Sequence, residues 1–247
     1  MKKRILFGML VVFFGGLLGS TSFAGAPPSV GGPAGAPGEP IAGGKKGAII
    51  FELGYYNPSL KTLNDDLKVY GFPEIGGNLL LTFKGMFPPP RSPVYPYVGV
   101  SYWAGSTTRE TDKTEAKVTL ISIPCGLQIP ILTGTLPPQV MLYIDVGGDV
   151  AISLWHYEEA GGDYYNANAI GYDIVAKVGG QYFIVPNTFS VGGSIGYAFL
   201  GKTGQLTVSD STLTGWDVDD KLETSGGKKL VFELSGITLM FDVRLWF

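Results

Sequence analysis

The chain has 247 residues and a mass of 26.3 kDa, and it is rich in Gly and in aromatic residues. Its formal net charge of −3, single Cys and single His exclude a basic nucleic-acid surface, a disulfide framework, a CxxC metal site and chemistry that needs several imidazoles. With 16% charged residues and a mean hydropathy of +0.21, the chain is expected to fold, and its composition indicates no cofactor.

The chain begins with the pattern of an export signal. Residues 2–4 are basic, residues 5–18 are apolar, and Ser22 and Ala24 take the small-residue positions before a cleavage site. The apolar run is shorter than the roughly 20 residues of a spanning helix. We therefore predict a signal peptide over residues 1–24.

Residues 25–46 consist mainly of Gly, Ala and Pro, and they predict a flexible periplasmic leader. No later segment has 18 consecutive apolar residues, which argues against a helical membrane protein. The remaining segment, residues 47–247, is expected to form one domain.

That segment alternates with a period of two, which places its apolar and polar side chains on opposite faces of a sheet. The pattern is clearest from Val140 to Trp155, where the even positions are aliphatic or Gly. Eight strands are predicted: Gly47–Tyr56, Asn78–Phe87, Val94–Ala104, Lys117–Ile131, Val140–Trp155, Ile170–Ile184, Phe189–Leu200 and Ile237–Phe247.

The fourth predicted strand is ambiguous, because Pro124 and Pro130 interrupt it and a bulge could switch its faces. Its expected apolar face holds Thr119, Ile121, Ile123 and Cys125.

The connections alternate between long and short. Long polar stretches follow the odd strands: Asn57–Gly77, Gly105–Ala116, His156–Ala169 and Gly201–Lys229. Short ones follow the even strands: Pro88–Pro93, Leu132–Gln139 and Val185–Thr188. This order is typical of an all-β transmembrane barrel of eight antiparallel up-and-down strands, with both ends of the barrel on the periplasmic side.

A soluble eight-stranded barrel is the alternative, but its outer face would carry charges. Here the charged residues share the face opposite the aliphatic one, and we expect them to form a polar network in the lumen: Glu52, Lys84, Asp145, Asp149, Asp173, Lys177, Asp242 and Arg244. A charge on the lipid face would cost roughly 2–4 kcal/mol at mid-membrane. Glu233, which has the apolar-side parity, is expected to project past the bilayer.

On these patterns, residues 47–247 resemble the small outer-membrane β-barrel families of the OmpA transmembrane domain, OmpX and OmpW. The alternating apolar residues of the last strand carry the most specific part of the resemblance: Phe241, Val243, Leu245 and Phe247. The resemblance implies the outer membrane of a Gram-negative-type bacterium. It also implies contact with outer-membrane lipid and lipopolysaccharide, and recognition of the last strand by the barrel-assembly machinery.

An eight-stranded barrel is just wide enough to be filled by side chains. We therefore expect a largely side-chain-filled lumen, in a non-catalytic protein of structural or surface-interaction type. The alternative is a narrow, OmpW-like channel for small, mostly apolar solutes. Catalysis is not expected, because His156 is the only His and Ser153 has the opposite parity on the same strand.

The first and last long connections, residues 57–77 and 201–229, are the segments expected to contact an extracellular partner. In the first, Asn57 and Pro58 are the predicted start of a short helix and Gly71 its end. Its expected apolar face holds Leu60, Leu63, Leu67 and Tyr70. The last connection has three acids near Trp216 but lacks the Gly and the distal Glu of an EF-hand loop, so no metal site is predicted.

Overall fold

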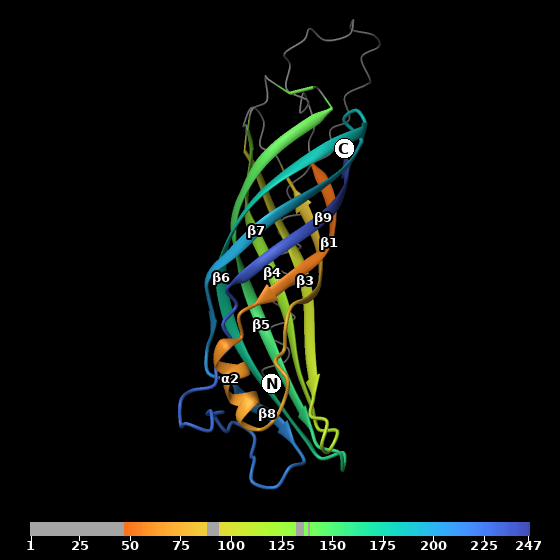
Figure 1. The fold of residues 1–247 in the computed structure, drawn as a ribbon. Coiled ribbons are helices and arrows are strands. Elements are labelled where there is room, and N and C mark those ends of the chain that lie inside the picture. Colours follow the sequence, from red (N-terminus) through yellow and green to blue (C-terminus); the bar gives the residue numbers. More distant parts are fainter. Residues whose placement is uncertain (1–46, 88–93, 132–135, 138) are drawn as a thin grey trace, which may run out of the picture. The chain divides into compact units, whose positions relative to one another are not determined.

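The computed structural model describes residues 47–87, 94–131, 136–137 and 139–247, and all of them belong to one compact unit. The predicted signal peptide (1–24), the leader (25–46), Pro88–Pro93 and part of Leu132–Gln139 lie outside the described residues. Figure 1 shows the elements, which in chain order are β1 (Ala48–Pro58), α2 (Lys61–Val69), β2 (Asn78–Met86), β3 (Tyr95–Thr108), β4 (Glu115–Ile131), β5 (Val140–Glu158), β6 (Tyr164–Val185), β7 (Phe189–Thr203), β8 (Thr207–Ser211) and β9 (Gly236–Trp246).

Eight of the strands form a closed antiparallel barrel, as predicted. Each strand pairs with its neighbour in the order β5-β4-β3-β2-β1-β9-β7-β6, and β5 pairs with β6 to close the ring. The short β8 is extra to this ring and pairs with the outer part of β6. The barrel therefore has no free edge along its eight-stranded wall.

The two rims of the barrel differ in what they carry. The first residue of β1, Ala48, pairs with Trp246 of β9, so both ends of the barrel lie at one rim together with the β6–β7 turn. We call this the turn rim. The opposite rim, the loop rim, carries α2, β8 and the connections β3–β4 and β5–β6 (Figure 1).

Alternation along the strands produces an apolar outer wall. In β9, for example, Ile237, Leu239 and Phe241 are each more than half exposed, whereas Thr238 and Met240 between them are buried. Outward aromatic side chains occur toward both ends of this apolar band: Phe87, Tyr182 and Phe247 near the turn rim, and Tyr55, Tyr102, Tyr172 and Tyr197 toward the loop rim. This distribution is the one expected of a barrel wall that faces lipid.

β4 keeps a single register against β5 over its whole length, from Glu115 opposite Glu158 to Ile131 opposite Leu142. Its proposed bulge is therefore absent, and Ile121 and Cys125 face outward as expected. The register shift toward the loop rim occurs instead between β6 and β7, beside Leu200, whose left-handed backbone (φ 54°) and 76% exposure mark an outward bulge.

Strand residues make up half of the predicted connection Gly105–Ala116 and most of the predicted connection His156–Ala169. β3 and β4 extend into Gly105–Ala116 until Thr108 pairs with Glu115, and β5 and β6 extend into His156–Ala169 until Glu158 pairs with Tyr164. These segments are polar on their outer face, which made them resemble loops. Their inner face, however, packs on the apolar side chains of the loop rim, and β5 and β6 thereby reach 19 and 22 residues.

The helix begins later than predicted. Asn57 and Pro58 are the last residues of β1 and pair with Ile237 and Gly236, so α2 starts only at Lys61. α2 has nine residues, and no helix among the described residues is long and apolar enough to cross a membrane.

The predicted helix end is confirmed. Gly71 has a φ of +78°, its N–H donates to Lys68 O, and the Phe72 N–H donates to Leu67 O, which is a Schellman motif. Of the expected apolar face of the helix, Leu60, Leu63 and Leu67 are buried, but Tyr70 is 52% exposed because it lies at the end of the last turn.

The last long connection is also partly ordered into the barrel wall. β7 continues to Thr203 and β8 follows, whereas residues 230–235 run beside β7, with Leu234 N–H donating to Gly201 O. On the other side the Ser59 N–H donates to Ser235 O and the Leu60 N–H to Glu233 O, so residues 230–235 continue the line of β9 toward the loop rim, between β7 and the segment that leads into α2.

Candidate functional site: the barrel interior

The interior is organised in layers along the barrel. The layer at the turn rim is aromatic: Trp246 packs edge-on against Tyr95 (ring centroids 6.2 Å apart) and at a tilt against Phe183 (5.7 Å). The Trp246 indole N–H donates to Ser190 Oγ at 3.0 Å. The buried members of this layer are Ala48, Ile50, Met86, Tyr95, Tyr97, Met141, Tyr143, Phe183 and Trp246.

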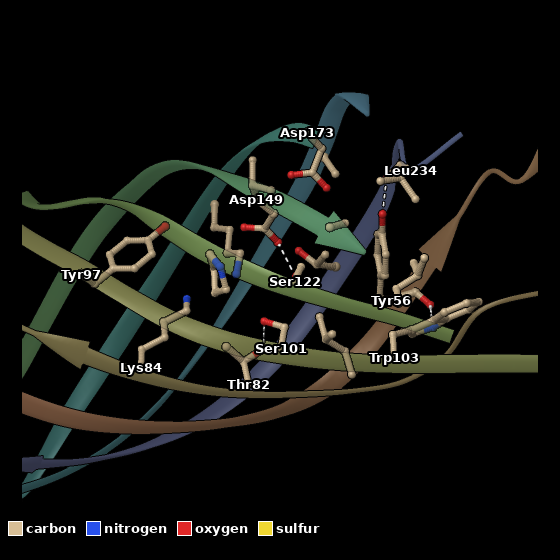
Figure 2. A pocket seen from close by; sticks show the side chains of 18 residues that line it. Tyr56, Thr82, Lys84, Tyr97, Ser101, Trp103, Ser122, Asp149, Asp173 and Leu234 are labelled. Carbon is tan, nitrogen blue, oxygen red and sulfur yellow. Dashed lines mark hydrogen bonds between the residues drawn. The ribbon is translucent and has the colours of Figure 1, made fainter. Parts of the chain in front are cut away.

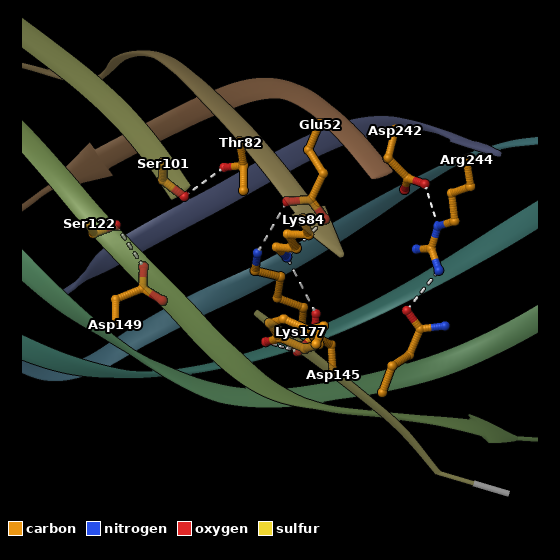
Figure 3. Close-up of polar contacts among 12 residues, drawn as sticks. Glu52, Thr82, Lys84, Ser101, Ser122, Asp145, Asp149, Lys177, Asp242 and Arg244 are labelled. Atoms are coloured by element: carbon orange, nitrogen blue, oxygen red, sulfur yellow. Dashed lines mark hydrogen bonds and ion pairs between the residues drawn. The ribbon is translucent and has the colours of Figure 1, made fainter. Parts of the chain in front are cut away.

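Next to the aromatic layer, toward the loop rim, lies a first polar cluster, centred on Lys84 (Figure 3). Its ammonium donates to Glu52 Oε1 at 2.9 Å, lies 3.9 Å from Asp145 Oδ2 and lies 4.5 Å from the ring centroid of Tyr97. The Tyr97 hydroxyl donates to Asp145 Oδ1 at 2.5 Å, and Lys177 Nζ lies 4.0 Å from Glu52 Oε2. Strands β1, β2, β3, β5 and β6 each contribute one side chain, so the cluster ties most of the wall together.

A second polar cluster surrounds Arg244 of β9. Its Nε donates to Asp242 Oδ1 at 2.7 Å, and its Nη1 donates to Gln128 Oε1 at 2.8 Å. Gln181 Nε2 donates to Asp242 Oδ1 at 2.6 Å, and the guanidinium lies 4.8 Å from the ring centroid of Tyr143. Arg244 and Asp242 are each 1% exposed, so the pair depends on these partners rather than on bulk water.

Between the polar clusters and the loop rim lies a cavity of about 40 Å³, which is room for a few water molecules (Figure 2). Two of the predicted network acids, Asp149 and Asp173, line it and are direct cross-strand partners on β5 and β6. Ser122 Oγ donates to Asp149 Oδ2 at 3.3 Å, and a Thr82–Ser101 hydroxyl pair at 2.9 Å lies on the opposite wall.

The loop-rim layer closes the interior with apolar side chains. The Trp103 indole N–H donates to Tyr56 O at 3.1 Å, and the two rings pack edge-on with centroids 6.2 Å apart. Trp155 packs in the same way on Phe232, which is fully buried. Three α2-side leucines join this layer and are 5% exposed or less: Leu60, Leu63 and Leu67.

Glu233 joins the loop-rim layer to α2. Its Oε2 accepts a hydrogen bond from the Thr62 N–H at 2.9 Å, and its Oε1 accepts one from the Thr62 hydroxyl. No side chain of the helix itself caps this N-terminus, so an acid from a distant segment takes that role. Glu233 lies beyond the apolar band, as expected, but its contact with α2 could not be predicted from the sequence.

Beyond the loop-rim layer, farther from the turn rim, three aromatic rings stack in a row. Tyr157 stacks on Tyr165 with centroids 5.2 Å apart, and Tyr165 stacks on Trp216 at 5.3 Å. In the neighbouring β3–β4 turn the Arg109 side chain hydrogen-bonds Asp112 and holds the pKa of that carboxyl well below its usual range. These contacts order the exposed end of the sheet.

The residues considered for catalysis lie apart. Ser153 is fully buried on the inner face, whereas His156 lies on the outer face between Asn166 Oδ1 (2.8 Å) and Glu158 Oε2 (3.1 Å). Within the described ranges, no group of three or more His, Cys, Asp or Glu side chains could hold a metal ion.

The structure places all eight residues of the predicted lumen network on the inner face of the barrel. It divides them, however, among the Lys84 cluster, the Arg244 cluster and the cavity. Sequence reasoning missed the uncharged members Gln128, Gln181 and Ser190, each at most 2% exposed. The alternation of the strands indicated that these side chains face inward. Nothing in the sequence indicated that they join the hydrogen-bond network of Asp242 and Arg244.

No family model and no curated protein matches the chain. Solved structures do match it. A major outer membrane protein from Thermus thermophilus aligns over 83% of this chain and 100% of its own, with a TM-score of 0.56 and 12% identity.

Two further structures align less closely. Neisserial surface protein A covers 81% of this chain and 97% of its own (TM-score 0.45, 13% identity). Ail of Yersinia pestis, in complex with the heparin analogue sucrose octasulfate, covers 82% and 99% (TM-score 0.41, 13% identity). The closed ring of strands and the Thermus alignment together establish the fold: the chain is a small eight-stranded antiparallel β-barrel of the outer-membrane type.

Proposed function

We propose that the protein is a non-catalytic barrel of a bacterial outer membrane whose role is structural or is exerted at the cell surface. The apolar outer band supports a lipid surround, and the short connections at the turn rim support a periplasmic position for that rim. The loop rim then faces the exterior, where residues 57–77 and 201–229 offer exposed side chains such as Tyr70 and Val218 to a partner.

The inward-facing clusters support a structural role for the lumen network. Lys84 and Arg244 are 2% and 1% exposed, and each contacts acids or amides from several strands. Breaking one such buried ion pair by removing one partner typically costs about 3–5 kcal/mol, because the other charge is left uncompensated. The network thereby couples strands that are distant in the chain.

The outward residues of the last strand support a role in assembly. Ile237 to Phe247 alternate apolar side chains toward lipid, and Phe247 closes the wall through mutual backbone hydrogen bonds with Gly47 (3.1 and 3.2 Å). We place the contact with the barrel-assembly machinery on Phe241, Val243, Leu245 and Phe247, and the contact with lipid and lipopolysaccharide on the outer band.

The observation that carries the proposal is the closure of the interior by two side-chain layers. A channel for apolar solutes would need a path past Trp103, Trp155 and Glu52, whose exposed fractions are 1%, 3% and 3%. A side-chain-filled lumen of this kind is typical of small eight-stranded barrels.

Planar-bilayer conductance tests this function. The purified wild-type protein should be electrically silent. A variant that opens both layers, Trp103→Ala with Trp155→Ala and Trp246→Ala, should show openings and serves as the positive control. Discrete openings of the wild type at the level of that variant would favour the channel and contradict the closed barrel.

A further inference from the structure

The strongest unexplained feature of the interior is the pair of acids at the cavity. Asp149 of β5 and Asp173 of β6 are direct partners across two hydrogen-bonded strands, and both carboxylates face the same cavity (Figure 2). Directly opposite residues of an antiparallel pair have Cβ atoms about 4.5–5.5 Å apart, and like charges there repel. The arrangement therefore needs a source of compensation.

The charged residues of the interior do not supply it. The inner face holds five acids and three bases, and the bases lie with the other three acids: Lys84 and Lys177 with Glu52 and Asp145, and Arg244 with Asp242. Among the described residues, neither Asp149 nor Asp173 forms an ion pair. Two carboxylates are thus left in excess, both at the cavity.

Two oxygen atoms at the cavity also lack partners. Asp173 is 8% exposed, and its Oδ1 has no hydrogen-bond partner among the described residues. Thr238 of β9 is 4% exposed and also lines the cavity, and its Oγ1 is likewise unpartnered within the described part of the chain. Buried polar atoms are normally paired with protein or with ordered water. These atoms indicate that something besides the protein's own donors occupies the space.

The walls of the cavity favour a proton and water over a metal ion. Lys84 and Lys177 line the same space, and their charge disfavours a divalent metal ion there more strongly than a single proton. The other ionisable or polar side chains that line the cavity come from other strands: Tyr56 (β1), Thr82 (β2), Tyr97 and Ser101 (β3), Ser122 (β4) and Thr238 (β9), whereas β7 contributes only Ala198 among the described lining residues. Asp145 lies outside the cavity lining and accepts the hydrogen bond of the Tyr97 hydroxyl. None of these lining side chains adds a third carboxylate to the cavity wall.

From this geometry we infer that Asp149 and Asp173 form an internal proton-binding site, in which a proton is held between the two carboxyl groups and the cavity water in the folded barrel at neutral pH. Burying an unpaired carboxylate is so unfavourable that such a group takes up a proton instead. This inference is independent of the proposed role at the cell surface.

The site links folding to pH. In the unfolded chain both acids are ionised above about pH 4, so folding at higher pH requires uptake of a proton. Stability contributed by this pair is therefore greatest at low pH and falls as pH rises, by up to about tenfold in the folding equilibrium per pH unit for one proton. An amide in place of one acid removes that dependence.

The test combines infrared spectroscopy with unfolding measurements on the full-length protein in detergent. The wild type should show the carbonyl stretch of a protonated carboxylic acid at neutral pH, and Asp149→Asn and Asp173→Asn should each lose it. The matched control is Asp163→Asn in the exposed β5–β6 turn, which should retain it. Relative to Asp173→Asn, the unfolding equilibrium constant of the wild type should rise with pH, by up to about tenfold per unit.

Two results would overturn the site: a wild-type spectrum without the protonated band, or a constant wild-type to variant ratio across pH. Elemental analysis of the purified protein gives a further check. One tightly bound divalent ion per barrel, lost in the Asp149→Asn variant, would mean that a metal ion and not a proton compensates the pair. If a variant does not fold, the wild-type spectrum and metal content still decide.

Discussion

Single side chains fasten segments of this barrel that are far apart in the sequence. The Glu233 carboxylate holds the first turn of α2 through Thr62, and the Asn64 side chain makes two hydrogen bonds with the backbone of Ile75 (2.9 and 3.1 Å). Glu233 was expected to lie beyond the membrane because it precedes the membrane-crossing stretch Ile237–Phe247, but the sequence could not reveal that this acid caps a helix 171 residues away. Such contacts depend on which strands become neighbours, and no local pattern encodes that.

Replacing Glu233 by Ala should loosen α2 and leave the barrel intact. The loss of an N-terminal cap costs about 0.5–2 kcal/mol, which corresponds to roughly 2- to 30-fold faster local opening. Hydrogen exchange of the α2 amides measures this, with Glu223→Ala in the exposed last connection as the control. Equal exchange in the two variants would show that the cap does not hold the helix.

At the scale of elements, the sequence predicted the end of α2 correctly and its start wrongly, because the end depends on a local preference and the start on a contact with another strand. Gly71 ends the helix by its own backbone conformation, which the residue type reveals. Asn57 and Pro58 look like a helix start, yet they extend β1 because β9 offers them a pairing partner. Strand pairing is a non-local contact and overrides the capping preference.

The same reasoning gives a matched pair of glycine substitutions. Gly71→Ala should destabilise the end of the helix by about 1–2 kcal/mol, because the left-handed conformation is unfavourable for a residue with a Cβ. The new Cβ would not clash, since the nearest atom would be 3.8 Å away. Gly76→Ala, with no atom within 4 Å and no positive φ, should have little effect. The rate of protease cleavage within residues 57–77 should be higher for Gly71→Ala than for Gly76→Ala. Equal rates would contradict the role of Gly71 in ending the helix.

For the whole molecule, the period-two pattern and the order of connections were sufficient to predict a closed eight-stranded barrel with charges inside. They were insufficient beyond the apolar band, where β5 and β6 continue with polar outer faces. There the inner positions pack on α2 and on residues 230–234, segments whose position the pattern could not predict. The same limit applies to the interior. The charged residues predicted a polar network there, but they did not indicate that Gln128 and Gln181 hydrogen-bond Arg244 and Asp242.

A charge on the outer wall should distinguish lipid from water as the surrounding medium. Val146→Arg, in the middle of the outer face of β5, should lower the stability of the barrel in vesicles by roughly 2–4 kcal/mol. Thr108→Arg, at the loop-rim end of β3 and opposite Glu115, should have little effect. The fraction that keeps its folded gel mobility in unboiled SDS reports this difference; equal fractions would argue against a lipid-facing wall.

β5 and β6 form a long hairpin that extends past the other strands at the loop rim. A strand of 22 residues is roughly 70 Å long along its own axis, whereas about 9–11 tilted residues cross the bilayer, so the β5–β6 turn lies beyond the membrane. At that turn, a Cβ added at Gly161 or Gly162 would have no atom within 4 Å. With the loop rim on the cell exterior, as proposed, a peptide inserted between them would be displayed at the end of this hairpin, which makes the turn a suitable place for an epitope tag that is detected on intact cells.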